Sequence, residues 1–305
     1  MDGVAFVSTN SAVAFTGGKK IPPDKLMAAG TLMLVDPSHS KGGFTGVPAN
    51  GSALTNIAAD YAATLTGVAA STLHPAWGIT AQATDLVLER TPKGGFHVMS
   101  SQSTMAINRY VTLILPSSIK DYIYAHMDNV YALTIWRRVT RVANAATNPY
   151  FYIGNAPGVN QGLITLIHTG TSPTTASAVR TLTGGANQNA LANMNEQIKA
   201  TGWSGAKPTN ISQVGNLLAN WGTGGAGPWG TGGQNIAPSS VLYRMAFEDL
   251  TATAAARTAA GELNNTVAAR YAEFQSIDAA DWTAAFAAGG RYYGDTWSDP
   301  ATVIP

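Results

Sequence analysis

The sequence has 305 residues, and its 18 basic and 17 acidic residues give a formal net charge of +1. Charged residues make up 11% of the chain, whereas an average soluble domain has about 25%. Hydrophobic residues make up 45%, which excludes a disordered chain. Because the charges nearly cancel, no strong attraction to a polyanion is available, and we expect no nucleic-acid partner.

The chain contains no cysteine, so disulfides, thiolate metal sites and cysteine nucleophiles are excluded. The five histidines lack the close spacings of zinc motifs, so we expect no metal site and place His97 and His168 at strand ends or the core rim. Residues 222–227 fit the pattern GxGxxG, but no strand leads into them and no helix follows, so we expect no cofactor. No window approaches 18 uninterrupted apolar residues, which predicts a protein made in the cytosol without membrane insertion.

The first part of the chain differs in pattern from the rest. Residues 1–52 show no sustained hydrophobic period and are rich in Gly, Pro, Ser and Lys, which predicts an extended arm. Apolar residues then recur at helical spacing, which predicts a short amphipathic helix that Thr55 caps and Gly67 ends. We therefore divide the chain into an N-terminal arm with a short helix, residues 1–70, and a second domain, residues 71–305.

Most of the second domain has the pattern of strands. Six runs are rich in β-branched or aromatic residues and are bounded by turn residues: 85–90, 105–115, 131–142, 150–154, 163–168 and 241–250. In the last run, the apolar residues Val241, Tyr243, Met245 and Phe247 fall on one face, and Arg244 and Glu248 fall on the other. That alternation predicts a strand with one buried side. Because no long helix separates successive strands, we predict a mainly β fold, an antiparallel β-sandwich.

The segments between and after these strands have weaker patterns. Residues 186–202 and 211–221 are expected to form helices, and residues 221–233, which repeat WGTGG, a glycine-rich loop. Two short helices are expected over 266–274 and 278–288, the second with Asp278 as its N-cap and Gly289 at its end.

Few carboxylates have a spacing that suits catalysis. Glu248 and Asp249 are adjacent at a strand end, so they point to opposite sides and cannot act on one substrate together. Asp85 and Glu89 could share a strand face, although the neighbouring Arg90 favours a solvated edge. No serine lies in a GxSxG motif. A glycan-cleaving enzyme that uses Glu248, or Asp85 with Glu89, is the weakest alternative, and we expect the chain not to be an enzyme.

Two further charged groups have structural interpretations. Asp295 and Asp299 flank Trp297 and could hold Ca²⁺ or form Asx turns, and turns are favoured. The basic cluster over residues 137–141 (RRVTR) carries too little charge for a nucleic-acid surface and suits an edge or interface strand better.

The C-terminal quarter carries a resemblance to a known class of proteins. The runs VLYRMAFEDLTA (241–252) and AARYAEFQSIDAADWTAAFAAGGRYYGDTWSDP (268–300) resemble the closing strands of laminin-G-like or concanavalin A-like jelly rolls in tailed-bacteriophage virion proteins. Residues 49–67 (ANGSALTNIAADYAATLTG) are similar to the N-terminal portions of such proteins. Together the C-terminal quarter and residues 49–67 cover about a third of the chain.

The resemblance implies a structural component of a virion. On this reading, residues 71–305 are a jelly-roll sandwich and the N-terminal arm docks on the particle. The expected partners are other virion proteins and copies of the chain itself in a homo-oligomer, located in the virion after synthesis in the host cytoplasm. A tail fibre or baseplate-associated subunit is favoured over a capsid decoration (cement) protein. The resemblance implies no sugar site, because the acidic Ca²⁺ ligands found beside the ligand loop of such domains have no counterpart here.

A third alternative is a carbohydrate-binding module that attaches the particle to a host-surface glycan. Flat aromatic rings stack on sugar faces, and the chain has several rings outside clear strand cores. The alternative interpretation is that these rings fill the core or contact a partner. The candidate glycan- or partner-binding residues are Trp203, Trp221, Trp229, Tyr293 and Trp297, with Tyr292 beside them.

Overall fold

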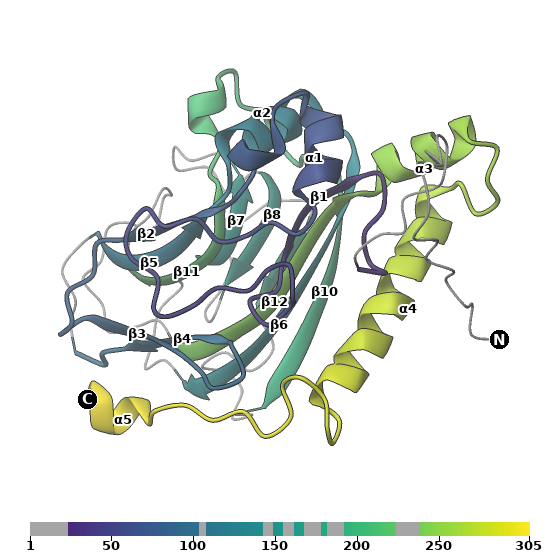
Figure 1. Ribbon diagram of the computed structural model, residues 1–305. Helices are drawn as coiled ribbons and strands as arrows, with labels where there is room; N and C mark the ends of the chain where they lie inside the picture. Colours follow the sequence, from purple (N-terminus) through teal and green to yellow (C-terminus); the bar gives the residue numbers. More distant parts are fainter. Residues whose placement is uncertain are drawn as a thin grey trace, which may run out of the picture.

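The protein is a two-layer sandwich of β-sheets with helices at one end and over one face (Figure 1). The computed structural model describes residues 24–103, 108–142, 149–154, 162–167, 178–181, 192–223 and 238–305, and the structural statements below concern these residues. Nearly all neighbouring strands are antiparallel, and β8 with β9 is a parallel pair. The predicted mainly β fold, an antiparallel β-sandwich, is confirmed.

The first sheet is built around β12. One edge of β12 pairs with β6, and the other pairs with β4 over residues 240–242 and with β1 over residues 245–248. The strand order is β10-β6-β12-β4-β3, with β1 beside β12. The strands are β1 (Thr31–Val35), β3 (Leu86–Arg90), β4 (Phe96–Ser100), β6 (Val130–Arg141), β10 (Asn193–Thr201) and β12 (Ser239–Asp249).

The second sheet has the order β2-β5-β11-β7-β8-β9. Its strands are β2 (Ala76–Ile79), β5 (Arg109–Ile114), β7 (Pro149–Gly154), β8 (Gly162–Ile167), β9 (Ala178–Thr181) and β11 (Leu217–Thr223). The runs predicted as strands from β-branched and aromatic content are strands β3, β5, β6, β7, β8 and β12, so that prediction is confirmed.

The helices fall into two groups. Helices α1 and α2 lie at one end of the sandwich, whereas α4 runs along the outer face of the first sheet after the shorter α3 (Figure 1). No helix among the described residues has the length and apolar composition that a membrane crossing requires. The helices are α1 (Ala59–Thr66), α2 (Ser117–Ala125), α3 (Leu250–Ala259), α4 (Val267–Phe286) and α5 (Pro300–Val303), with short 3₁₀ turns η1 (Ala70–Thr72) and η2 (Ile211–Gln213).

The main core fills the space between the two sheets and is rich in aromatic rings. Trp77 packs edge-on against Phe96, with ring centroids 5.0 Å apart, and Tyr150 packs edge-on against Trp221 at 5.3 Å. All four side chains are buried, and edge-to-face pairs of this kind are worth about 0.5–1.5 kcal/mol beyond the burial of their area. The first pair joins the two sheets, because Trp77 lies in β2 of one sheet and Phe96 in β4 of the other, whereas Tyr150 and Trp221 both lie in one sheet.

The expectation of an extended arm through residue 52 is wrong for residues 31–35. These residues form β1, whose five side chains are all buried. A short apolar run buried on both faces has no alternation to reveal it, so it was not distinguished from the loops around it. Gly30, which precedes the strand, passes so close to the carbonyl oxygen of Asp249 that a side chain would not fit. Residues 31–35 thus belong to the sandwich itself.

Two of the expected helices are strands or turns. Residues 193–201, expected to be helical, form β10, and residues 211–221 form η2 and the start of β11. In β10 the buried positions alternate, from Met194 through Glu196 to Ile198, and this period of two was hidden by the polar side chains between them. Pairing with β6 along the whole strand outweighs the weak helical preference of these residues.

The other predicted helices are closer to the structure. The helix expected over 55–67 is confirmed as α1, which Gly67 ends in a left-handed conformation with φ of 72°, although its N-cap is Ala58 and not Thr55. The two short helices expected near the C-terminus are one helix, α4, of 20 residues. Asp278 is therefore a buried residue inside α4 and not an N-cap.

Strand β12 is buried on both faces, which corrects the prediction of one buried side. Arg244 and Glu248, which were expected to face outward, do lie on the outer face of the sheet, but α4 and the segments beside it cover them. The sequence places charges there because they pair with charges on α4 and on the segment before β1. A charged outer face was thus mistaken for a solvated one.

Candidate functional site

The aromatic residues predicted to bind a glycan do not form one surface. Trp221 is completely buried, and its indole nitrogen donates to Ser240 Oγ at 2.7 Å. Trp203 is 9% exposed, and its nitrogen donates to the carbonyl of Ala206 at 3.3 Å. Both are core residues, so neither offers a ring face to a sugar, which corrects that prediction.

The remaining predicted aromatics have different positions. Trp229 and most of the glycine-rich loop, residues 224–233, lie outside the described residues, as does His168. Tyr293 is 53% exposed, whereas its neighbour Tyr292 is buried. Trp297 is half-buried, with the guanidinium of Arg138 4.7 Å from its ring centre. Among the members of this set that the structure describes, only Tyr293 is an exposed ring.

A buried group of ion pairs joins β12 to three other parts of the chain. The guanidinium of Arg244 lies 3.0 Å from Asp24 before β1, 3.3 Å from Asp36 after β1, and 2.9 Å from Asp281 in α4. Burial opposes ionisation, but the three carboxylates outweigh it and raise the pKa of Arg244 above its usual value. The charged guanidinium therefore holds these segments to the sheet.

The same carboxylates also bind the segment that follows α4. Arg291 donates to Asp281 at 3.1 Å and to Asp36 at 3.0 Å. The hydroxyl of Tyr292 donates to Asp36 at 2.7 Å, and Ser38 donates to the same oxygen at 2.8 Å. Asp36 is thus the shared acceptor that joins β1 to the C-terminal segment.

Asp278 forms a second buried polar cluster, between α4 and the first sheet. Its carboxylate accepts from Thr134 and Trp136 of β6, both at 2.9 Å, and from Asn195 and Gln197 of β10 at 2.5 and 2.6 Å. Four donors from two strands converge on one helix residue. Such a satisfied network fixes the position of α4 on the sheet.

A third polar cluster contains a histidine between a hydroxyl and a carboxylate. His97 Nδ1 lies 2.8 Å from Glu89, and Nε2 lies 2.8 Å from Thr140 Oγ1. Since a carboxylate only accepts, the neutral ring carries its proton on Nδ1 and accepts from Thr140 at Nε2. The backbone and hydroxyl of Ser298 donate to the same carboxylate at 2.8 and 2.6 Å, and Trp297 packs edge-on to the imidazole.

The protonation states in this cluster follow from burial and hydrogen bonding. Burial lowers the pKa of His97, and the neighbouring Glu89 only partly opposes this. For Glu89, partial burial favours the protonated form, but the hydrogen bonds from His97 and Ser298 outweigh it and lower its pKa. The order hydroxyl, imidazole, carboxylate is that of a hydrolytic triad. Here, with the ring buried under Trp297, these contacts hold the C-terminal segment against the sheet.

The carboxylates considered as metal or catalytic groups have structural partners. Glu248 and Asp249 do point to opposite sides, as expected, since Glu248 binds Arg270 and Asp249 accepts from Tyr122 at 2.9 Å. Asp299 caps α5 by accepting from Ala301, which confirms a turn at this position. Within the described ranges, no group of three or more His, Asp or Glu side chains could hold a metal ion.

Concave surface is found along the segment that precedes β1. One hollow of about 570 Å³, the Arg291 hollow, lies between this segment and α4 and is lined by Asp24, Lys25, His39, Ser276, Ile277, Ala280, Asp281, Ala284 and Arg291. A second of about 530 Å³, the Arg257 hollow, shares Lys25 and is lined also by Met27, Ala28, Ala29, Tyr61, Thr253, Ala256, Arg257, Glu262 and Glu273. The two hollows therefore adjoin at Lys25.

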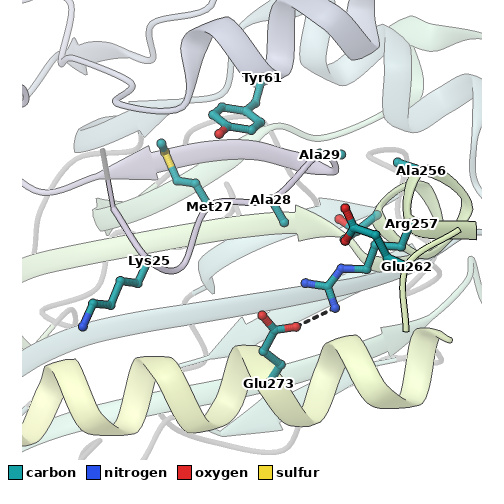
Figure 2. Close-up of a pocket in the computed structure, with 10 residues that line it drawn as sticks. Lys25, Met27, Ala28, Ala29, Tyr61, Ala256, Arg257, Glu262 and Glu273 are labelled. Atoms are coloured by element: carbon teal, nitrogen blue, oxygen red, sulfur yellow. Dashed lines mark ion pairs between the residues drawn. The ribbon is translucent and has the colours of Figure 1, made fainter. Parts of the chain in front are cut away.

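The Arg257 hollow has an apolar side and a charged side. Figure 2 shows Tyr61 and Met27 on one side, and Arg257 with Glu273 on the other. The two charged groups lie 2.6 Å apart, and hydrogen bonds from Arg257 help to lower the pKa of Glu273 against the effect of burial. These two charges neutralise each other, and Lys25 and Glu262 are the other charged residues of the lining.

A third hollow adjoins the second at Tyr61 and is lined by both polar and apolar residues. This Tyr61 hollow has a volume of about 520 Å³ and lies between α1, η1 and the loop after β1. Its lining comprises Lys41, Thr55, Asn56, Ile57, Ala59, Asp60, Tyr61, Ala70, Ser71 and His74. Sequence reasoning missed this site because its polar residues are up to 33 positions apart, from Lys41 to His74, and share no motif. The one relevant signal was the helical spacing of the apolar residues around Tyr61, which predicted an amphipathic helix.

Comparisons with known proteins give little further guidance. No family model matches the sequence, and no curated protein matches it. Among the solved structures that the chain matches is "Trypanosoma rangeli Sialidase in Complex with 2-Keto-3-deoxy-D-glycero-D-galacto-2,3-difluoro-nononic acid (2,3-difluoro-KDN)", with 10% sequence identity and a TM-score of 0.35. The match covers 73% of this chain and 31% of that chain, so this chain spans less than a third of the structure's length.

The expectation that the chain is not an enzyme is corrected and withdrawn: it has no positive support, and the solved structure that the chain matches is an enzyme. At a TM-score of 0.35 the likeness carries no argument for a sialidase activity here.

Proposed function

We propose that this chain is a structural subunit of a bacteriophage virion, a tail-fibre or baseplate-associated component that acts by assembly and surface display. The observation that carries the proposal is the position of residues 241–252 and 268–300, the runs that resemble the closing strands of virion jelly rolls. These residues supply most of the central strand β12, most of the helix α4, and the C-terminal segment that covers the first sheet. The resemblance therefore concerns the first sheet and the elements that cover it.

The buried ion pairs support a role as a stiff building block. Arg244 and Arg270 join β12 to α4, and Asp36 joins β1 to the C-terminal segment. Each link crosses between elements far apart in sequence, so the sheet, its helical cover and the end of the chain move together. A subunit that transmits load or presents a surface in a particle needs this kind of rigidity.

The surface composition supports burial by neighbouring subunits. The exposed side of α3 consists largely of small residues, among them Ala255, Ala256, Ala259 and Ala260. With 11% charged residues, the chain lacks the dense charge that keeps free proteins apart. Many modest contacts of this kind gain strength through repetition in an assembly, since each docked copy raises the effective concentration of the next contact.

Immunogold labelling of virions tests the proposal directly. Particles would be purified from a bacterial culture that carries the coding sequence, and an antibody against the purified chain would be applied to them. We expect gold at the tail and the chain's peptides in the particle's mass spectrum, with unrelated phage particles as the control. Gold over the capsid would instead assign the chain to capsid decoration. Absence of the peptides from purified particles would overturn the virion proposal.

A further inference from the structure

We infer that the Tyr61 hollow binds a saccharide. This inference goes beyond the proposed role in assembly, which needs no small ligand. The hollow has a volume of about 520 Å³, within the range of roughly 300–1,000 Å³ that is usual for small-molecule sites. Its lining combines one aromatic ring with polar side chains of both signs.

Several polar groups of this hollow are available to a ligand. In the part of the chain that the structure describes, no hydrogen bond or ion pair engages the side chains of Lys41, Asp60, Ser71 or the Tyr61 hydroxyl. In the neighbouring hollows the arginines are engaged, since Arg291 pairs with Asp281 and Arg257 pairs with Glu273. The Tyr61 hollow therefore retains unused donors and acceptors around one concave surface.

The floor of the hollow is held rigidly by Asn56. Its side-chain oxygen accepts from Leu34 at 2.9 Å and from Ala58 at 3.0 Å, and its amide nitrogen donates to the carbonyls of Leu32 and Leu73, both at 3.0 Å. One buried amide thus ties β1, the start of α1 and the end of η1 together. A site supported in this way is preorganised, which reduces the cost of ordering side chains on binding.

The same residue sets the tautomer of His74. The backbone nitrogen of Asn56 donates to His74 Nδ1 at 3.0 Å, so this nitrogen is unprotonated and the neutral ring carries its proton on Nε2. Nε2 has no partner among the described residues, and His74 lines the hollow. The imidazole can therefore donate one hydrogen bond to a ligand.

These groups match the chemistry of a sugar. Hydroxyl groups of a saccharide both donate and accept, so they can use the ammonium of Lys41 and the imidazole N–H of His74 as donors and the carboxylate of Asp60 as an acceptor. The C–H face of a pyranose can stack on the ring of Tyr61. One cation and one anion give no net charge, which disfavours a phosphate or a polyanion. An uncharged, polyhydroxylated ligand fits the set best.

The test is binding of the purified full-length chain to an array of immobilised bacterial and mammalian saccharides, followed by saturation-transfer NMR with the best ligand in solution. We expect at least one saccharide to bind, with saturation transferred to its ring C–H protons by Tyr61. Binding to none of the immobilised saccharides would overturn the inference.

Variants of the lining separate this site from other surfaces. Asp60 lies on the exposed side of α1, and the variant Asp60→Asn should weaken saccharide binding about tenfold. Tyr61→Ala should weaken binding to the same extent. Tyr61→Phe keeps the ring face that stacks on the sugar, so its affinity should stay within about threefold of the wild type. The matched control is Tyr293→Ala, which removes an exposed ring on the C-terminal segment and should leave binding unchanged. Thermal unfolding of each variant shows whether it is folded.

Two results would contradict the assignment to this hollow. Unchanged affinity in both Asp60→Asn and Tyr61→Ala would place the ligand elsewhere, and loss of binding in Tyr293→Ala alone would place it on the C-terminal segment. Either result leaves the virion proposal intact, because labelling of particles does not depend on sugar binding. Conversely, a chain absent from virions could still bind the saccharide.

Discussion

The guanidinium of Arg270 in α4 forms a paired contact with the carboxylate of Glu248 in β12, with Nε to Oε1 at 2.7 Å and Nη2 to Oε2 at 2.6 Å. Both side chains are buried. Hydrogen bonds from Thr253 to Glu248 and from Arg270 to the carbonyl of Leu26 satisfy further polar atoms. Burial opposes the charge, but Glu248 outweighs it and raises the pKa of Arg270, so the pair is ionic and fastens α4 to the centre of the first sheet.

Breaking this pair on one side should be strongly destabilising. Replacing Arg270 with Met leaves Glu248 buried without its cation, which we expect to lower the free energy of unfolding by about 3–5 kcal/mol. The double replacement Glu248→Leu with Arg270→Met removes both charges and should cost clearly less. Urea unfolding of the two variants and the wild type measures the difference. Equal losses in the single and double variants would show that the pair itself is unimportant.

The cluster around Asp278 gives a second prediction. Asp278→Ala removes the acceptor of Trp136 and Asn195, whereas Thr134 can still donate to Asn195 and Gln197 to the carbonyl of Gln275. Each unpaired buried polar group costs about 1–3 kcal/mol, so we expect a loss of at least about 2 kcal/mol. Asp121→Ala, at an exposed position of α2, is the control and should change stability by less than about 0.5 kcal/mol. Similar thermal midpoints for the two variants would contradict the account.

The stability of the fold should depend on the protonation of His97. Because burial lowers the pKa of this residue in the folded protein, with Glu89 and Asp295 opposing, the unfolded chain takes up a proton near pH 6.5 that the folded protein takes up only at lower pH. The free energy of unfolding should therefore fall as the pH drops below about 6.5, by at most about 1.4 kcal/mol per pH unit.

Urea unfolding of the wild type and of His97→Gln at a series of pH values from neutral to mildly acidic tests this dependence. The variant should be less stable at neutral pH and should lose a smaller amount of stability on acidification, because it has no imidazole at this position. Parallel pH profiles for the two proteins would show that another group causes the acid sensitivity.

The aromatic residues predicted from the sequence should separate into core and surface positions. Trp221→Ala removes a completely buried ring that packs on Tyr150, and we expect a loss of about 3–5 kcal/mol. Tyr293→Ala, at a residue that is 53% exposed, should stay within about 0.5 kcal/mol of the wild type. Thermal unfolding compares them, and a stable Trp221→Ala protein would mean that this ring is not part of the core.

The sequence predicts the sandwich well where strands alternate or are rich in β-branched and aromatic residues, as in β6 and β12. Prediction from the sequence fails for strands that form only because a neighbouring strand pairs with them. The residues of β10 have weak local preference and become a strand because β6 offers a partner along their whole length. The run TLMLV of β1 is short and its last four residues are all apolar, so no alternation indicates a strand, and the structure shows both of its faces buried.

The polar clusters could not be predicted for a related reason. Arg244 and Asp36 are 208 positions apart, and Glu89 and Ser298 are 209 apart, so no spacing rule relates them. Charges in β12 indicated a solvated face, whereas α4, which was expected to be two short helices, covers them. Aromatic residues indicated a sugar surface, yet burial depends on the packing of the two sheets, which fills the interior with Trp221 and leaves Tyr293 outside.

The mass and shape of the purified chain in solution test the central claim most directly. Light scattering coupled to size exclusion gives the mass, and negative-stain images of the same peak give the shape. A virion subunit should form a homo-oligomer, with a mass that is a whole-number multiple of 31.6 kDa and with protruding lobes of one sandwich each. A compact monomer at all concentrations would contradict assembly as the function of this chain.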